Sequence, residues 1–300
     1  MFTGCGTALV TPFRPDRSLD EDAMRRLVRR QIDAGINFLV PCGTTGESPT
    51  LTPAEHKRVV EITLGEAKGK VPVLAGAGGY NTSEVVHLAK DLEAMGVDGI
   101  LSVTPYYNKP TQEGLIQHYR AIAGAIHIPI IVYSVWGRTG VNVLPGTLAA
   151  LAKIDNIIGV KEASGNIGQM AQVILQTPGD FVVLSGDDSM TVPLLSLGGR
   201  GLISVAANEI PAEMTAMVQA GLAGDFNKAR RLHYQYLPLM EVNFVESNPI
   251  PVKAAMALMG LLEPVWRLPL TPPSADHQRK IETVLEESGV SIERRTSVAG

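Results

Sequence analysis

A lysine closes a short apolar run in this sequence. The segment 157–161, IIGVK, is rich in β-branched residues and bounded by turn formers, which predicts a buried strand. Lysine is rarely buried without a partner. An apolar pocket favours its neutral amine, which can attack a carbonyl and form a Schiff base. We therefore treat Lys161 as a candidate nucleophile; the alternative is a lysine that leaves the strand into solvent or pairs with a carboxylate.

A tyrosine ends the preceding predicted strand, 128–133, IPIIVY. Neighbouring strands lie about 4.8 Å apart, so Tyr133 and Lys161 can meet. A tyrosine beside a Schiff-base lysine can move protons between the imine and the substrate. The alternative for Tyr133 is an aromatic core residue whose hydroxyl finds a hydrogen-bond partner.

Two further segments have the composition of carboxylate sites. Gly43–Gly46, GTTG, fits a backbone nest in which successive N–H groups bind a carboxylate and the threonine hydroxyls add donors. Its alternative is a simple glycine-permitted turn. Arg138 lies between two glycines just after the Tyr133 strand and can hold a second carboxylate bidentately. Its alternative is a surface ion pair.

Metal and thiol chemistry find little support in the sequence. No histidine or further carboxylate accompanies Asp187 and Asp188 at ligand spacing, so we expect a solvated or helix-capping pair. The six histidines are scattered, and we assign none to a metal. Cys5 and Cys42 fit buried free thiols in a reducing compartment better than a disulfide. We expect neither a metal nor a cofactor.

The elements that position these residues alternate between strand and helix. The predicted strands span 4–10, 38–41, 71–75, 99–103, 128–133, 157–161, 181–185 and 201–205. Helices are predicted to start at 18–20, at the capping box 52–55, at 82–84 and at 145, and to cover 112–125, 167–176 and 211–220. Alternation implies parallel strands, and eight units predict an α/β fold, a (β/α)8 TIM barrel. The alternative, a doubly wound sheet, lacks a Gly-x-Gly-x-x-Gly after the first strand.

Strand signals stop after Gly224. The segments 225–240, 249–259 and 274–287 predict helices. We expect a catalytic barrel over 1–224 and a C-terminal helical region over 225–300 that serves packing or assembly. The polar tail from Ser291 is expected to fray.

Composition excludes several classes of protein. Hydrophobic residues make up 45% of the 300 residues, enough for a full core, and the formal net charge is −4. No basic cluster points to nucleic acid. No apolar run has the length of a transmembrane span, and the N-terminus does not read as a signal peptide. We expect a cytoplasmic protein whose partners are small molecules, with no role for a membrane.

Taken together, these residues resemble the pyruvate-dependent class I aldolase family, to which N-acetylneuraminate lyase belongs. The similarity runs from Gly4 to at least Pro269. The family-wide motifs are GTTGES at 43–48, the Tyr133 segment and GVKEA at 159–163, and the segment LSGDD at 184–188 fits the resemblance as well. PYYNKP at 105–110, GRTG at 137–140 and ESNPIPVK at 246–253 resemble the members that condense pyruvate with L-aspartate 4-semialdehyde. The resemblance implies that reaction, the first dedicated step toward diaminopimelate and lysine.

The resemblance also implies catalytic roles. Lys161 would form the imine with pyruvate and Tyr133 would transfer protons. Thr44 and Tyr107 would extend a proton relay toward solvent. In the family the tyrosine matching Tyr107 reaches into the site of a neighbouring subunit, which implies a homotetramer built as a dimer of dimers.

The implied binding residues surround that lysine. Thr45 would hold the pyruvate carboxylate, and Arg138 the carboxylate of the aldehyde. Gly186 and Ile203 would line the pocket through their backbone. The chain departs from the family at Trp136, where a proline is usual, which leaves room for a different aldehyde.

Two alternative functions remain open. One is a related aldolase or dehydratase that acts on a sugar acid or on a keto acid derived from hydroxyproline. The other is a non-catalytic binding or regulatory protein on the same barrel, since fold does not imply function.

The resemblance further implies an effector site for lysine at a subunit interface. The matching positions are Ser48, His56, Tyr80, Glu84 and Tyr106. Tyr80 stands where asparagine is usual, and Pro53 stands where sensitive members carry histidine. Since proline offers no polar side-chain group and tyrosine only one hydroxyl, we expect weak or absent inhibition by lysine.

Overall fold

Eight parallel strands form the centre of the computed structural model, which describes residues 1–293. The strands are β1 (Gly4–Ala8), β2 (Phe38–Val40), β3 (Leu74–Gly76), β4 (Gly99–Val103), β5 (Ile130–Ser134), β6 (Ile157–Glu162), β7 (Val182–Ser185) and β8 (Gly201–Ser204). Their order is β2-β1-β8-β7-β6-β5-β4-β3, and a parallel bridge between Leu39 and Val73 joins the two ends. The predicted (β/α)8 barrel is therefore confirmed.

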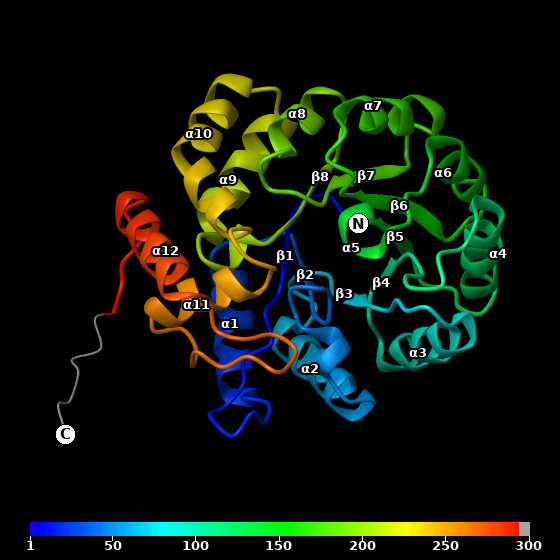
Figure 1. Ribbon diagram of the computed structural model, residues 1–300. Helices are drawn as coiled ribbons and strands as arrows, with labels where there is room; N and C mark the ends of the chain where they lie inside the picture. The colour runs from blue at the N-terminus through cyan, green and yellow to red at the C-terminus, as the bar shows by residue number, and fades with distance from the viewer. Residues whose placement is uncertain (294–300) are drawn as a thin grey trace.

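Most helices surround the strands on the outside, and the short α5 lies within the ring that they form, as Figure 1 shows. The helices before β8 are α1 (Glu21–Asp33), α2 (Pro53–Ala67), α3 (Thr82–Met95), α4 (Gln112–Ala123), α5 (Trp136–Thr139), α6 (Pro145–Leu151), α7 (Ile167–Gln176) and α8 (Thr191–Ser196). After β8 come α9 (Pro211–Leu222), α10 (Phe226–Val242), α11 (Ile250–Leu258) and α12 (Ala275–Glu287), and two short 3₁₀ turns are η1 (Ser48–Thr50) and η2 (Ala206–Asn208). The predicted capping box is present at α2, where the Thr52 side chain accepts from the Glu55 N–H and the Glu55 side chain accepts from the Thr52 N–H.

Sequence patterns missed two short helices and shifted two strands. Neither α5 nor α8 was expected, because four and six residues are too few to display a helical period. Strand β3 begins at Leu74 rather than at residue 71, and β5 begins at Ile130 rather than at residue 128. A proline precedes each start, Pro72 and Pro129, and a proline has no N–H to donate to a neighbouring strand.

Two apolar layers hold the barrel together. The interior cluster includes Phe38, Leu74, Leu184 and Ile203, all fully buried, whereas a larger cluster fills the space between strands and helices. Gly6 on β1 makes room for the interior ring: a Cβ at that position would lie 2.2 Å from the Phe38 ring. The barrel interior is therefore a core packed with side chains.

The helices after β8 gather on one side of the barrel, where α10 packs against α9 and α12 packs against α10 and α11 (Figure 1). A buried ion pair ties them to the barrel, because Lys253 Nζ lies 2.5 Å from Glu47 Oε1 and both side chains are inaccessible to solvent. Arg267 adds an ion pair to Glu55 at 2.6 Å. Within the described part of the chain, no helix has both the length and the apolar character that crossing a bilayer requires.

The expected fraying from Ser291 is wrong for the residues that the structure describes. The Glu293 N–H donates to the Leu258 carbonyl at 2.8 Å, and Ile292 packs against the outer apolar cluster. Apolar contact and one backbone bond are enough to hold this segment. The rest of that prediction falls on 294–300, outside the described residues.

Candidate active site

Lys161 lies at the end of β6, beside Tyr133 at the end of β5. The two residues are direct partners in the parallel register of the strands. Their side chains are 5% and 6% exposed, and Lys161 Nζ lies 4.3 Å from the centre of the Tyr133 ring. The alternating direction of side chains along a strand turns both toward the barrel axis. A buried amine and a phenol therefore share the space at the mouth of the barrel.

Gly186, just after β7, leaves the room that the lysine side chain occupies. A Cβ at this position would lie 3.2 Å from Lys161 Cε and 2.6 Å from the Cβ of Ala163. The Gly186 N–H also donates to the Glu162 carbonyl at 2.8 Å, which fixes the segment against β6. Any larger residue would press on the Lys161 side chain.

A cavity of about 150 Å³ opens at this end of the strands. Its lining consists of Thr45, Tyr133, Val135, Arg138, Lys161, Ala163, Gly186, Asp187, Val205, Phe244 and Asn248. The structure thus brings five of the eight candidate catalytic and substrate-binding residues together: Thr45, Tyr133, Arg138, Lys161 and Gly186.

The other three candidates, Thr44, Tyr107 and Ile203, are outside this lining. Ile203 is fully buried in the interior cluster. Thr44 lies in the turn before Thr45 and is partly exposed. Tyr107 is 92% exposed and its backbone has φ +66°, a left-handed conformation that non-glycine residues rarely adopt. Within one subunit, Tyr107 therefore directs its side chain into solvent.

The Gly43–Gly46 segment forms a tight turn. Within it, the Gly46 N–H donates to the Gly43 carbonyl and the Glu47 N–H donates to the Thr44 carbonyl, both at 3.1 Å. The Thr45 hydroxyl accepts a hydrogen bond of 2.9 Å from Asn248 Nδ2. Since a hydroxyl has one proton and two lone pairs, Thr45 keeps its proton to donate toward a ligand.

Arg138 lies on the short helix α5 and is exposed. One of its guanidinium nitrogens, Nη2, donates to the Asn248 backbone carbonyl at 3.0 Å. A guanidinium has five N–H donors, so this contact orients the group and leaves donors for an anion.

Sequence reasoning missed Asn248 as a site residue. It reaches the cavity from the segment before α11, far from the strand ends in sequence. Sequence reasoning also missed the buried pair of Lys253 with Glu47, which lies two residues after Thr45 in the chain. The available signal was a lysine inside the apolar segment Ile250–Met256, because a cation on an apolar helix requires a buried partner.

The expectation that the aspartate pair is solvated is wrong for Asp188, which instead caps the start of η2 from a buried position. Asp188 is 1% exposed, and its carboxylate accepts from the Ser204 hydroxyl at 2.5 Å and from the Val205 N–H at 3.0 Å. Burial raises the pKa of Asp188 to about 6. Asp187 does cap a turn, accepting from the Ser189 N–H at 2.9 Å. Asp188 therefore braces the segment after β8 from inside.

The two cysteines are free and buried, as expected. Burial raises the pKa of the Cys42 thiol, and burial together with the charge of Asp188 raises that of Cys5. A thiol that resists ionisation is a poor nucleophile. Among residues 1–293, no cluster of three or more metal-ligating side chains occurs.

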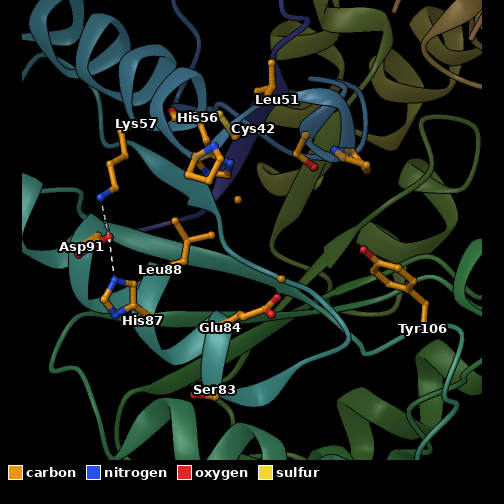
Figure 2. A pocket seen from close by; sticks show the side chains of 15 residues that line it. Cys42, Leu51, His56, Lys57, Ser83, Glu84, His87, Leu88, Asp91 and Tyr106 are labelled. Carbon is orange, nitrogen blue, oxygen red and sulfur yellow. Dashed lines mark hydrogen bonds and ion pairs between the residues drawn. The ribbon is translucent and has the colours of Figure 1, made fainter. Parts of the chain in front are cut away.

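A second and larger cavity, of about 680 Å³, is lined by residues of α2, α3 and η1. Figure 2 shows Glu84 and Tyr106 beside this cavity and His56 above it, with Lys57, Asp91 and His87 joined by ion pairs at one side. The lining includes four of the five candidate effector residues: Ser48, His56, Glu84 and Tyr106. The fifth, Tyr80, packs edge to face on Tyr106 with ring centres 5.4 Å apart.

Comparison with known proteins gives one consistent result. A model of the dihydrodipicolinate synthetase family matches residues 1–288. The 4-hydroxy-tetrahydrodipicolinate synthase of Koribacter versatilis is 53% identical over 288 residues, which are 96% of each chain. A monomeric dihydrodipicolinate synthase variant of known structure is 46% identical with a TM-score of 0.95, covering 97% of this chain and 98% of its own. The lysine-bound enzyme from Cyanidioschyzon merolae is 40% identical with a TM-score of 0.93, covering 96% and 98% respectively.

Proposed function

The chain belongs to the dihydrodipicolinate synthetase family, and on that premise we propose that it is a 4-hydroxy-tetrahydrodipicolinate synthase. It is a lyase of the class I aldolase type that condenses pyruvate with L-aspartate 4-semialdehyde. The observation that carries this proposal is the buried Lys161 with its Nζ over the Tyr133 ring, at the mouth of a small cavity.

Each chemical step has a group to perform it. The Lys161 amine attacks the pyruvate ketone and water leaves, which gives an imine. Loss of a proton from the pyruvate methyl group gives an enamine, whose carbon attacks the aldehyde. The amino group of the second substrate then attacks the imine carbon, closes the ring and releases Lys161. Tyr133 would carry the protons that these steps move, and the 4.3 Å between its ring centre and Lys161 Nζ supports this role.

Substrate binding is assigned to groups around that lysine. Thr45 binds the pyruvate carboxylate through the proton that its bond with Asn248 leaves free. Arg138 binds the carboxylate of the aldehyde through its remaining donors. Gly186 and Ile203 contribute backbone atoms to the pocket wall.

The proton relay through Thr44 and Tyr107 requires a neighbouring subunit. Tyr107 is 92% exposed in the single chain, so its hydroxyl reaches a cavity only if another subunit covers it. We accordingly propose a homotetramer, a dimer of dimers, in the cytoplasm, with residues 1–224 as its catalytic barrel. Sedimentation at assay concentration tests the assembly, and full activity of a monomer would refute a shared relay.

Trp136 bears on which aldehyde the enzyme accepts. Its side chain is 59% exposed, two residues before Arg138. A coupled assay with pyruvate and a panel of aldehydes tests this choice directly. We expect turnover with L-aspartate 4-semialdehyde. Preference for a sugar acid or a hydroxyproline-derived keto acid would assign the chain to a related aldolase or dehydratase, and no turnover with any of them would favour a binding protein.

For the second cavity we propose a weak effector site for lysine. Glu84 would pair with the amino group of the ligand, and Ser48 and His56 would meet its side-chain end. Tyr80 and Pro53 stand where an asparagine and a histidine would each offer the ligand a polar contact, and Pro53 itself lines the cavity.

A further inference from the structure

Among the hydrogen bonds of residues 1–293, Asn248 is the only residue of the cavity lining that bonds to both proposed carboxylate-binding residues, Thr45 and Arg138. Its Nδ2 donates to the Thr45 hydroxyl at 2.9 Å, and its backbone carbonyl accepts from Arg138 Nη2 at 3.0 Å. The residue is 6% exposed. Asn248 thus stands between the pyruvate side of the cavity and the aldehyde side.

One atom of Asn248 is unused. Within the described residues, its Oδ1 is buried and has no hydrogen-bond partner. A buried amide oxygen without a partner is costly, and such an atom in a binding cavity marks a place for a ligand donor. Since the amide nitrogen is held by Thr45, the oxygen is fixed in place.

The proposed second substrate carries a donor that requires such an acceptor. In L-aspartate 4-semialdehyde the ammonium and the carboxylate are bonded to the same carbon. Arg138 offers only donors, so it can bind the carboxylate but not the ammonium beside it. The carboxylate in the lining belongs to Asp187, whose Oδ1 already accepts hydrogen bonds from the N–H and the hydroxyl of Ser189.

We propose that Asn248 is the specificity residue for the amino group of the aldehyde. Its Oδ1 accepts a hydrogen bond from the substrate ammonium while its backbone carbonyl orients Arg138. This inference rests on the proposed function. The same contact holds the amino group near the imine carbon that it attacks during ring closure.

The test compares Asn248→Ala with Asn248→Asp, since the aspartate keeps an acceptor and lacks the donor to Thr45. Two readouts separate the ends of the substrate: kcat/KM for L-aspartate 4-semialdehyde, and the inhibition constant of succinic semialdehyde, which has the same carbon chain and carboxylate but no amino group. For Asn248→Ala we expect kcat/KM to fall about 10- to 100-fold, as for a lost hydrogen bond to a charged group, with the inhibition constant changed less than about threefold.

The aspartate variant should recover most of the loss in kcat/KM, whereas both variants should raise the KM for pyruvate through Thr45. Borohydride trapping of pyruvate on Lys161 shows that each variant is folded. An equal loss for succinic semialdehyde, or an aspartate variant no better than alanine, overturns the inference while the proposed function stands. A wild-type chain inactive toward L-aspartate 4-semialdehyde overturns both.

Discussion

Two buried lysines in this molecule have similar rings beside them and different partners. Lys161 Nζ lies 4.3 Å from the Tyr133 ring centre, and Lys253 Nζ lies 4.4 Å from the Phe13 ring centre. Lys253 is also paired with Glu47 at 2.5 Å. Among the ion pairs of residues 1–293, none includes Lys161.

The difference lies in what each amine is free to do. Burial lowers the pKa of Lys253, and the charge of Glu47 opposes that shift. A buried amine with a carboxylate partner is committed to that partner. A buried amine beside a neutral phenol is available to an incoming carbonyl. Burial alone therefore does not distinguish the two lysines; the buried carboxylate paired with Lys253 does.

The largest expected effect is at Lys161. Lys161→Met should lower kcat/KM by at least about 10⁴-fold, because the imine cannot form. Borohydride with pyruvate should add a reduced pyruvyl mass to the Lys161 peptide of the wild type and to no peptide of the variant. A label on Lys253, or activity without any label, would remove the distinction between the two lysines.

The second effect is on stability. Lys253→Met should lower the free energy of unfolding by about 3–5 kcal/mol, because it leaves Glu47 buried without a counterion. Denaturant-induced unfolding measures this, with the exposed Lys153→Met as the matched control. Adding Glu47→Gln should restore most of the loss. A Lys253 variant as stable as the control would show that the pair contributes nothing to the fold.

The third effect sharpens the assignment of the Lys161 region. Arg138→Ala should weaken use of the aldehyde by about 1.5–3 kcal/mol, the value of a hydrogen bond to a charged group. Trapping of pyruvate on Lys161 should be unchanged, because Arg138 does not contact the amine. Arg138→Lys keeps the charge without the bidentate geometry and should recover only part. Loss of trapping would place Arg138 on the pyruvate side instead.

The smallest effect concerns lysine binding in the larger cavity, which begins at Ser48, the residue after Glu47. Two lost polar contacts of about 1 kcal/mol each weaken lysine binding about 30-fold. An initial-rate titration with lysine at subsaturating pyruvate should show little inhibition. Tyr80→Asn combined with Pro53→His should increase sensitivity. Half-inhibition of the wild type at sub-millimolar lysine would show that Ser48, His56, Glu84 and Tyr106 suffice.

The barrel and the lysine–tyrosine pair were predictable because both depend on local patterns. Periodicity and capping residues predicted the strands, and the register of two adjacent strands then fixed the pairing of Tyr133 with Lys161. Asn248 with Thr45, and Lys253 with Glu47, are contacts between residues more than 200 positions apart. The periodic pattern of apolar residues along the chain does not predict such long-range contacts. The burial of Asp188 was also missed, because its donors Ser204 and Val205, at the end of β8 and just after it, lie on a different element.

Glu47 lies between a residue that lines the smaller cavity and one that lines the larger cavity. Two residues before it, Thr45 lines the smaller cavity; one residue after it, Ser48 lines the larger one. Glu47 itself is held by Lys253 in a left-handed conformation, φ +53°. One anchored residue therefore supports the walls of both cavities. A substitution in this turn that is meant to enlarge either cavity has to keep the Glu47–Lys253 ion pair.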